Sequence, residues 1–330
     1  MNFFDLHCDT LVECYENGAS LANNSFGVSL KMKQALGLWA QVFAIWIPAK
    51  FSGDRAWDYY QRVTDFFRQE LAVHSNRLSQ IRTGIELDAA FAAGKCAGIL
   101  AVENASAIGG DLRRLERMAR DGVKIITLTW NGENEVAHGA QFPSAHWRRA
   151  GKHTPALCSS GGLKPFGRQL LREMSALNVA ADVSHLNARS FWDVIDFDLP
   201  ILASHSNCRS VYDHPRALSD AQIRTLAERG IPLGLTFAYL RARQGRGAFA
   251  SCRDWSAIYK NAAYALMLGA ADILCVGTDY DGTPAPRGLE TTPQLINLRG
   301  YLARRGLSRD ILDKMFFDNT YGWFKREFIL

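Results

Sequence analysis

The sequence has 330 residues, of which 48% are hydrophobic and 22% are charged, and its formal net charge is +5. A chain of this length and composition can bury a large core, and it is long for one ordinary domain but normal for an α/β barrel. Arginines are scattered through helical stretches such as 111–120, so the small positive excess favours solvated helix faces over a nucleic-acid surface.

The cysteines indicate a reducing compartment. Their number is odd, they are dispersed and no C-x-x-C pair occurs, which favours free thiols over a disulfide framework; they are Cys8, Cys14, Cys96, Cys158, Cys208, Cys252 and Cys275. The N-terminus has no basic segment followed by an apolar run, so no signal peptide is expected. No apolar stretch approaches the ~20 residues that span a bilayer. We therefore expect a cytoplasmic protein without membrane association.

Short apolar runs alternate with longer amphipathic stretches along the chain. The first buried strand is expected from Phe3 to about Cys8, and the later ones at 38–47, 96–102, 123–129, 179–183, 200–203, 231–237 and 273–277. Helices are expected at 55–73, 111–121, 165–177, 219–229 and 254–268, with two more after Glu290 and Ser308.

Eight strands, most of them followed by a helix, predict a (β/α)8 TIM barrel. No break in composition marks a second domain, so residues 1–330 are expected to form a single barrel domain. The Gly-, Ser- and His-rich segment 131–162 is long for a connection, which favours a functional βα loop over a linker.

The stretch Asp5 to Asp9 carries the first chemical signal. On a strand, residues two apart point to the same side, so His7 and Asp9 can present an imidazole and a carboxylate to one point. Nitrogen and oxygen ligands suit zinc. Alone the pair is also compatible with a helix-capping aspartate beside a packed histidine.

Further candidate ligands follow the later strands. In a barrel, catalytic groups gather at the carboxyl ends of the strands, and here these ends carry His7, Asp9, Glu103, His185, His205 and Asp279. Three imidazoles and three carboxylates can hold two metal ions with one carboxylate bridging them, and water between two metals becomes acidic enough to act as a nucleophile.

A set of motifs in this order resembles the membrane (renal-type) dipeptidases of the amidohydrolase superfamily, over nearly the whole chain. The motifs are DLHCDTL at 5–11, GILAVENA at 98–105, ITLTWN at 126–131, GGLKPFGRQLLREM at 161–174, DVSHLN at 182–187, ILASHSN at 201–207 and VGTDYDG at 276–282. Each motif alone is a weak signal, whereas the ordered set is specific.

The resemblance implies a binuclear site with two Zn²⁺ ions per chain. His7 and Asp9 hold one ion in that arrangement, His185 and His205 hold the other, and Glu103 bridges both. Asp279 matches the family's catalytic aspartate, which takes a proton from the bridging water and passes one to the leaving amine.

The resemblance also implies a substrate clamp and a quaternary state. Arg216, eleven residues after His205, resembles the arginine that binds the terminal carboxylate of a dipeptide, and a guanidinium fork matches a carboxylate. The alternative is a surface arginine in a polar loop, without a role in substrate binding. Family members are often dimers, so a homodimer is compatible with the sequence.

Two positions depart from the family pattern. Trp130 replaces a histidine that contacts the substrate, and an indole donates one hydrogen bond but exchanges no proton near neutral pH. His138 and Asn131 are candidates to compensate. Where the family often has N-F-Y, this chain reads Thr236-Phe237-Ala238, with Tyr239 one place later. Trp130 and Arg216 are the expected substrate-binding residues, and the departures at Trp130 and Ala238 leave the identity of the substrate open.

The sequence therefore predicts a zinc-dependent dipeptidase in which metal-activated water attacks the amide carbonyl of a small, dipeptide-like substrate. Two alternatives stay open: an amidohydrolase acting on another small carboxylated amide, and a barrel that binds a metal or ligand without turnover. The preserved ligands and Asp279 argue against a pure binder, because a pure binder needs no proton shuttle.

Overall fold

A computed structural model describes residues 1–140, 161–238 and 255–329. The strands form one sheet in which all pairs are parallel. They are β1 (Phe3–Cys8), β2 (Trp39–Trp46), β3 (Leu78–Gln80), β4 (Cys96–Glu103), β5 (Val123–Thr127), β6 (Ala180–Asp182), β7 (Ile201–Leu202), β8 (Leu233–Leu235) and β9 (Leu274–Val276).

The sheet closes on itself as a barrel. Its order is β7-β6-β5-β4-β2-β1-β9-β8, and a parallel bridge between Ala203 and Leu233 joins β7 to β8. At this bridge the Gly234 amide donates to the carbonyl oxygen of Ala203 at 2.8 Å. The predicted (β/α)8 barrel is confirmed, with every predicted strand present. β1 has the predicted bounds, β4 extends one residue further than predicted, to Glu103, and the other six are shorter.

One strand of the sheet was not predicted. β3 pairs with the start of β4, at Cys96 to Gly98, whereas β5 pairs with the end of β4, at Leu100 to Glu103. β3 therefore lies outside the eight-strand ring. Its three residues, Leu-Ser-Gln, contain one apolar side chain, so they show no hydrophobic pattern that marks a strand.

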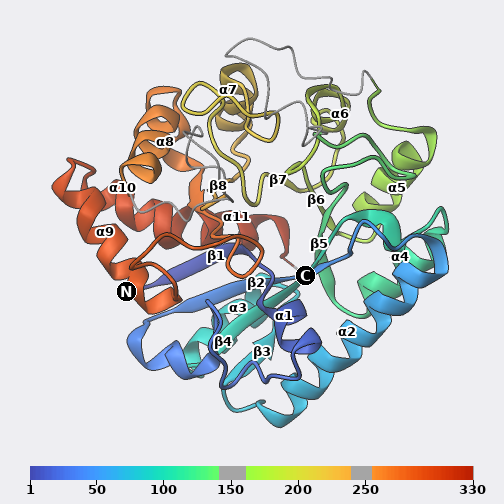
Figure 1. Ribbon diagram of the computed structural model, residues 1–330, viewed down its shortest axis with the longest axis horizontal. Helices are drawn as coiled ribbons and strands as arrows, with labels where there is room; N and C mark the ends of the chain where they lie inside the picture. Colours follow the sequence, from blue (N-terminus) through green and yellow to red (C-terminus); the bar gives the residue numbers. More distant parts are fainter. Residues whose placement is uncertain (141–160, 239–254, 330) are drawn as a thin grey trace, which may run out of the picture.

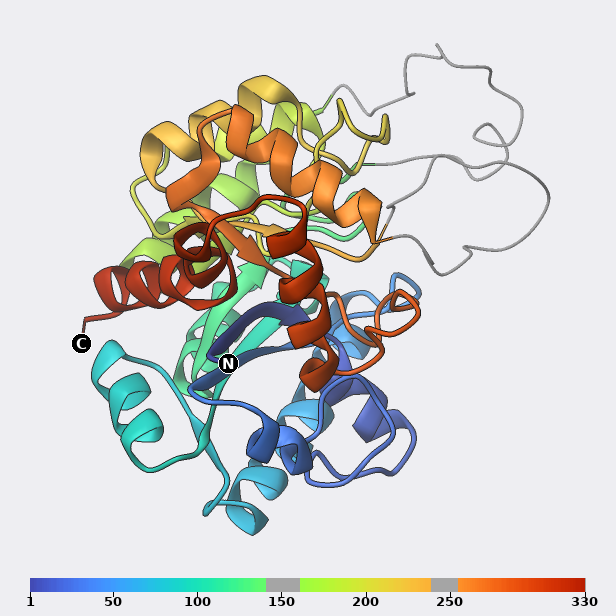
Figure 2. The ribbon, with the colours of Figure 1, turned by 90° about the vertical axis from the view of Figure 1, so that its left-hand side faces the viewer.

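Helices surround the strands on all sides (Figure 1), and in the side view they flank the sheet above and below (Figure 2). They are α1 (Thr10–Glu16), α2 (Gly53–Val73), α3 (Gly84–Ala92), α4 (Leu112–Arg120), α5 (Pro165–Ala176), α6 (Ala188–Val194), α7 (Asp220–Arg229), α8 (Ser256–Met267), α9 (Leu295–Arg304), α10 (Arg309–Asp313) and α11 (Asn319–Glu327). Shorter 3₁₀ or π turns are η1 (Leu30–Ala35), η2 (Ala105–Ala107), η3 (Ala270–Asp272), η4 (Thr292–Gln294) and η5 (Lys314–Asp318).

Capping explains several helix boundaries. Ser219 precedes α7 in a capping box with Gln222, and Pro165 occupies the first turn of α5, as expected. α1, α3 and α6 were not predicted, whereas the helix predicted after Ser308 is present as α10, η5 and α11 in direct succession. Of the three that were not predicted, α3 carries a readable signal, because Thr83 and Glu86 form a capping box.

Burial of the strands on both faces accounts for their continuous apolar runs. All six residues of β1 and all eight of β4 are buried, as expected where helices cover a parallel sheet. The described cysteines, Cys8, Cys14, Cys96, Cys208 and Cys275, are buried and free; Cys158 and Cys252 lie outside the described residues, as does most of the predicted loop 131–162. In the described ranges, no helix is long and apolar enough to cross a membrane.

Candidate metal centre and active site

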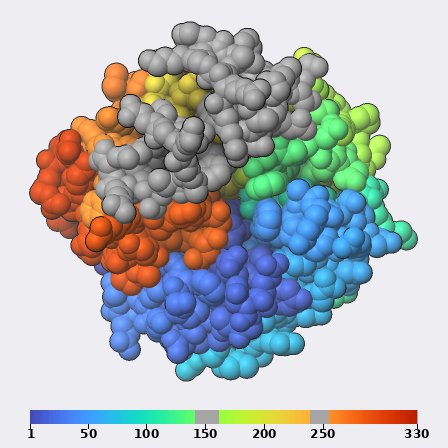
Figure 3. Space-filling model, viewed as in Figure 1, coloured from blue at the N-terminus to red at the C-terminus, as the bar shows by residue number. Residues whose placement is uncertain are grey.

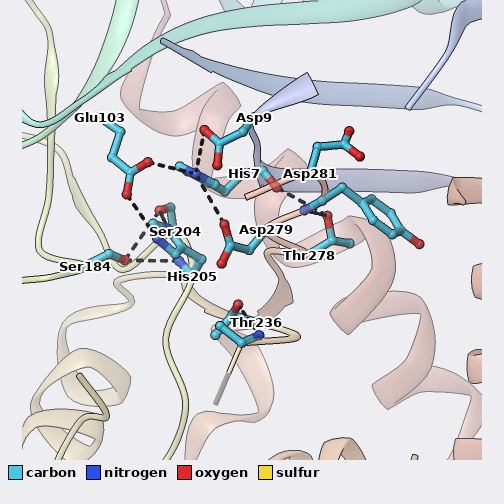
Figure 4. Close-up of polar contacts among 12 residues, drawn as sticks. His7, Asp9, Glu103, Ser184, Ser204, His205, Thr236, Thr278, Asp279 and Asp281 are labelled. Carbon is cyan, nitrogen blue, oxygen red and sulfur yellow. Dashed lines mark hydrogen bonds and ion pairs between the residues drawn. The ribbon is translucent and has the colours of Figure 1, made fainter. Parts of the chain in front are cut away.

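The carboxyl ends of separate strands bring three ligand side chains to one point. His7 lies near the end of β1, Glu103 ends β4, and His205 follows β7. Each offers a ligand atom within 4.8 Å of the others, and all three are buried. A second group within the same limit consists of His7, Asp9 and Asp279. Figure 4 shows these side chains converging around His7.

Asp9 acts toward His7 rather than as a helix cap. It occupies the position before α1, but its side chain makes no capping hydrogen bond. Instead, Asp9 Oδ1 lies 3.9 Å from His7 Nε2, and both atoms are buried without a hydrogen-bond partner among the described residues. Gly282 makes this arrangement possible, because a Cβ there would lie 2.0 Å from Asp9 Oδ2 and 2.6 Å from Asp279 Oδ1.

The tautomer of His185 leaves one ring nitrogen available as a ligand. Its Nδ1 lies 2.9 Å from the amide oxygen Oδ1 of Asn131, which only accepts, so Nδ1 carries the proton. Nε2 therefore presents a lone pair, 2.9 Å from Glu103 Oε1 and 2.9 Å from His205 Nε2. The possible compensating residue Asn131 thus orients His185.

A hydrogen-bonded relay sets the tautomer of His205 in the same way. The Ser204 hydroxyl donates to Asp182 Oδ2 at 2.6 Å, so its oxygen accepts from His205 Nδ1, which lies 2.7 Å away. The proton on Nδ1 leaves Nε2 of His205 with a lone pair, 3.6 Å from Glu103 Oε1. Asp182 is held in turn by Thr127 Oγ1 at 2.6 Å and by the Ser184 and Ser204 amides at 2.9 Å each.

The two facing lone pairs and the carboxylate repel one another, and a cation bound between them would remove this repulsion. Burial, with the Arg216 charge, lowers the pKa of His185 to about 4, and burial, with the charges of His7 and Arg216, holds that of His205 well below its usual range. Burial opposes ionisation of Glu103, but the surrounding imidazoles hold its pKa well below the usual range. Neutral imidazoles and an ionised carboxylate are the forms that bind metals.

Asp279 lies at the mouth of the same cluster. Its Oδ1 is 3.9 Å from His7 Nε2, and its backbone has φ 61°, a left-handed conformation that few non-glycine residues adopt. The Asp279 amide donates to the carbonyl oxygen of His7 at 3.1 Å, which fixes the turn. Burial raises the pKa of Asp279 well above its usual value.

Arg216 is buried beside the centre rather than exposed in a loop. Its Nη2 donates to the carbonyl oxygen of His205 at 2.9 Å, and its Nη1 donates to Ser206 Oγ at 3.2 Å. Only 6% of the residue is exposed. The alternative that Arg216 is a surface arginine is therefore wrong.

Trp130 borders the centre, whereas His138 turns away from it. The Trp130 ring centroid lies 6.2 Å from that of His185 and 5.5 Å from that of Trp46. His138 Nε2 pairs with Glu133 at 2.9 Å, and its Nδ1 lies 2.8 Å from the carbonyl oxygen of Gly162. His138 therefore does not replace the missing histidine.

The departure after β8 is partly within the described residues. Asn207 Nδ2 donates to the carbonyl oxygens of Thr236 and Ala238 at 3.1 and 2.8 Å, which holds this segment against the end of β7. Tyr239 lies outside the described residues.

Comparison with known proteins assigns the chain to a family. The model for the membrane dipeptidases (peptidase family M19) matches residues 1–326. The chain belongs to this family. It is therefore a metal-dependent dipeptidase built on a TIM barrel, and the predicted family resemblance is confirmed.

Solved structures of dipeptidases share the fold along its whole length. The metallopeptidase dipeptidase AC is 25% identical, with a TM-score of 0.88 and 99% of each chain covered. A metallopeptidase from Rhodobacter sphaeroides, solved with a phosphinate mimic of the dipeptide L-Ala-D-Ala, is 24% identical, with a TM-score of 0.87 and the same 99% coverage of each chain.

Relatives found by sequence match a smaller part of this dipeptidase than the solved structures do. A protein of Klebsiella pneumoniae from the pqqA 5′ region is 29% identical over 66% of this chain and 77% of its own length. The dipeptidase tcpJ of Claviceps purpurea is 25% identical over 78% of this chain, which spans 57% of that protein's length.

The residues that orient the ligands were not predicted from the sequence. Ser204 and Asp182 stand inside quoted motifs, but an Asp before one histidine and a Ser before another carry no readable link. Asp5 is the counterpart on the other side of the barrel: it accepts from the Thr278 amide at 2.9 Å and from Thr278 Oγ1 at 2.7 Å. Only the closed barrel brings these pairs together.

Proposed function

We propose that the centre holds two zinc ions per chain. His7 and Asp9 are assigned to one ion, His185 and His205 to the other, and Glu103 lies between the two pairs. Support comes from the donor set, since imidazole nitrogen and carboxylate oxygen are zinc ligands. The observation that carries the proposal is the 2.9 Å approach of two unprotonated Nε2 atoms, those of His185 and His205, beside Glu103 Oε1.

The reaction is hydrolysis of the amide bond of a dipeptide. Bound metal supplies an acidified water and polarises the carbonyl. The carboxylate of Asp279 accepts a proton from the attacking water and returns one to the leaving amine nitrogen. The buried guanidinium of Arg216 binds the terminal carboxylate of the substrate. Trp130 packs against the substrate.

Hydrolysis of a dipeptide library is the direct test. The full chain is stripped of metal and assayed with and without added Zn²⁺, on dipeptides that include D-residues at the second position. Zinc-dependent cleavage with about two ions bound per chain is the expected result. Bound zinc without cleavage of any dipeptide would favour another small carboxylated amide or a binding role, and absence of bound metal would contradict the site.

The proposal extends to the protein's cellular location and its oligomeric state. We propose a cytoplasmic protein without membrane association, supported by the five free, buried cysteines of the described residues. A homodimer is proposed on family resemblance alone, and sedimentation of the full chain measures it.

A further inference from the structure

A small pocket lies beside the metal centre, and of its lining residues only Trp130 has been given a role above. Its volume is about 120 Å³, and its walls come from the segments that follow β2, β4 and β5, including Phe51, Asn104, Ser106 and Trp130. In the space-filling view, blue atoms of the stretch after β2 adjoin green atoms of the stretch after β5 (Figure 3).

The pocket is held open by hydrogen bonds among its walls. Asn104 follows Glu103 with φ 76°, and its side chain joins the three strand ends: Nδ2 donates to the carbonyl oxygen of Ile47 at 3.1 Å, and Oδ1 accepts from Asn134 Nδ2 at 3.0 Å. Trp130 is supported edge-on by Trp46. A strained residue whose surroundings fix it is typical of a preformed binding site.

One polar atom in this lining lacks a partner. Ser106 is 5% exposed, and its Oγ is buried without a hydrogen-bond partner among the described residues. An unsatisfied buried hydroxyl costs free energy, which a ligand group able to donate or accept would recover. The amide groups of Asn104 and Asn134 already bond to the protein. Among the buried polar side-chain atoms of the lining, Ser106 Oγ is the one without a partner in the described residues.

The barrel order places this pocket opposite Arg216. In the closed ring of eight strands, β2 is the fourth strand from β7 in either direction, so the two strands lie opposite each other. Phe51 lies five residues after the end of β2, and Arg216 bonds to the carbonyl oxygen of His205, three residues after the end of β7. A substrate whose carboxylate lies at Arg216 and whose amide lies over Glu103 therefore directs its N-terminal residue toward the pocket.

We propose that this pocket binds the side chain of the substrate's N-terminal residue, and that Ser106 makes it selective for a short side chain with a hydroxyl or amide group. The inference rests on the proposed dipeptide hydrolysis. A volume of 120 Å³ equals about four water molecules at ~30 Å³ each, which suits side chains of three or four non-hydrogen atoms. Trp130 and Phe51 cover the stem, and Ser106 Oγ bonds to the polar tip.

Two pairs of near-isosteric dipeptides test the selectivity on the zinc-loaded full chain. Thr-Ala is compared with Val-Ala, and Asn-Ala with Leu-Ala, by kcat/KM. We expect the polar member of at least one pair to be preferred by about 10-fold, since its apolar partner leaves Ser106 Oγ unpaired. In Ser106→Ala the preference is expected to fall to about 1.

A matched control removes a buried hydroxyl elsewhere. Ser190 is fully buried, its Oγ bonds to the carbonyl oxygen of His138, and it does not line the pocket, so Ser190→Ala is expected to keep the preference. Equal or better cleavage of the apolar members in both pairs by the unmodified chain overturns the proposal, and so does a preference that survives in Ser106→Ala. Failure to cleave any dipeptide would instead contradict the proposed function.

Discussion

The hydroxyl oxygen of Ser204 lies 2.7 Å from Nδ1 of His205 and accepts its proton in a hydrogen bond. Because the same hydroxyl donates to Asp182, the serine cannot donate to the imidazole, and the ring keeps its lone pair on the side that faces Glu103. Outer partners of this kind fix the orientation and basicity of metal-binding histidines.

Removing that hydroxyl is expected to weaken metal binding. Ser204→Ala leaves His205 free to change tautomer and should lower zinc affinity by about 10- to 100-fold, measured by competition with a chelator. Ser190→Ala, which also loses a buried hydroxyl, should bind zinc as the unmodified chain does. Unchanged affinity in Ser204→Ala would show that the relay does not orient the ligand.

Asp279 is expected to act on turnover and not on metal content. Asp279→Asn keeps the size of the side chain and removes its ability to accept a proton, so both ions should remain bound while kcat falls by about 10²- to 10⁴-fold. Metal analysis and kinetics on the same preparation separate the two effects. An active Asp279→Asn protein would exclude the proton shuttle.

Arg216 is expected to discriminate by substrate charge. Arg216→Ala should raise KM for dipeptides with a free carboxylate by about 10- to 100-fold, because charge-assisted hydrogen bonds are lost. Dipeptide amides, which lack the carboxylate, should be affected much less. Arg209→Ala is the matched control, since Arg209 bonds to the carbonyl oxygen of Pro215. An equal effect on both substrate classes would count against the clamp.

The free energy of unfolding is expected to depend on pH through Lys124, the second residue of β5. Its Nζ donates to the carbonyl oxygen of Asn178 at 2.5 Å and lies 4.4 Å from the Phe328 ring centroid, yet burial lowers its pKa to about 8. The unfolded chain, with a lysine pKa near 10.4, then binds more protons between these values, so the free energy of unfolding rises with pH there.

Urea unfolding of the unmodified chain and of Lys124→Met between pH 7.5 and 9.5 isolates this effect. The unmodified chain should gain about 2 kcal/mol relative to the variant across the range. Other groups titrate in both proteins and cancel in the difference. A constant difference would show that Lys124 keeps its ordinary pKa when folded.

The sequence by itself determined the barrel and the identity of the candidate ligands. Continuous apolar runs mark strands that are buried on both faces, and parallel strands bring their carboxyl ends to one edge. His7, Glu103, His185 and His205 could therefore be placed together without knowing any distance. The pattern fails for β3, whose three residues are too few and too polar to show a period.

Tertiary structure alone decided how those ligands are oriented and what surrounds them. The Asp182–Ser204–His205 relay joins residues from two strand ends, and the Asn131–His185 bond joins residues 54 apart in the chain. Opposite positions of Arg216 and the Ser106 pocket follow from closure of the ring between β7 and β8. Such contacts depend on side-chain direction and register across non-adjacent segments, which local sequence patterns do not encode.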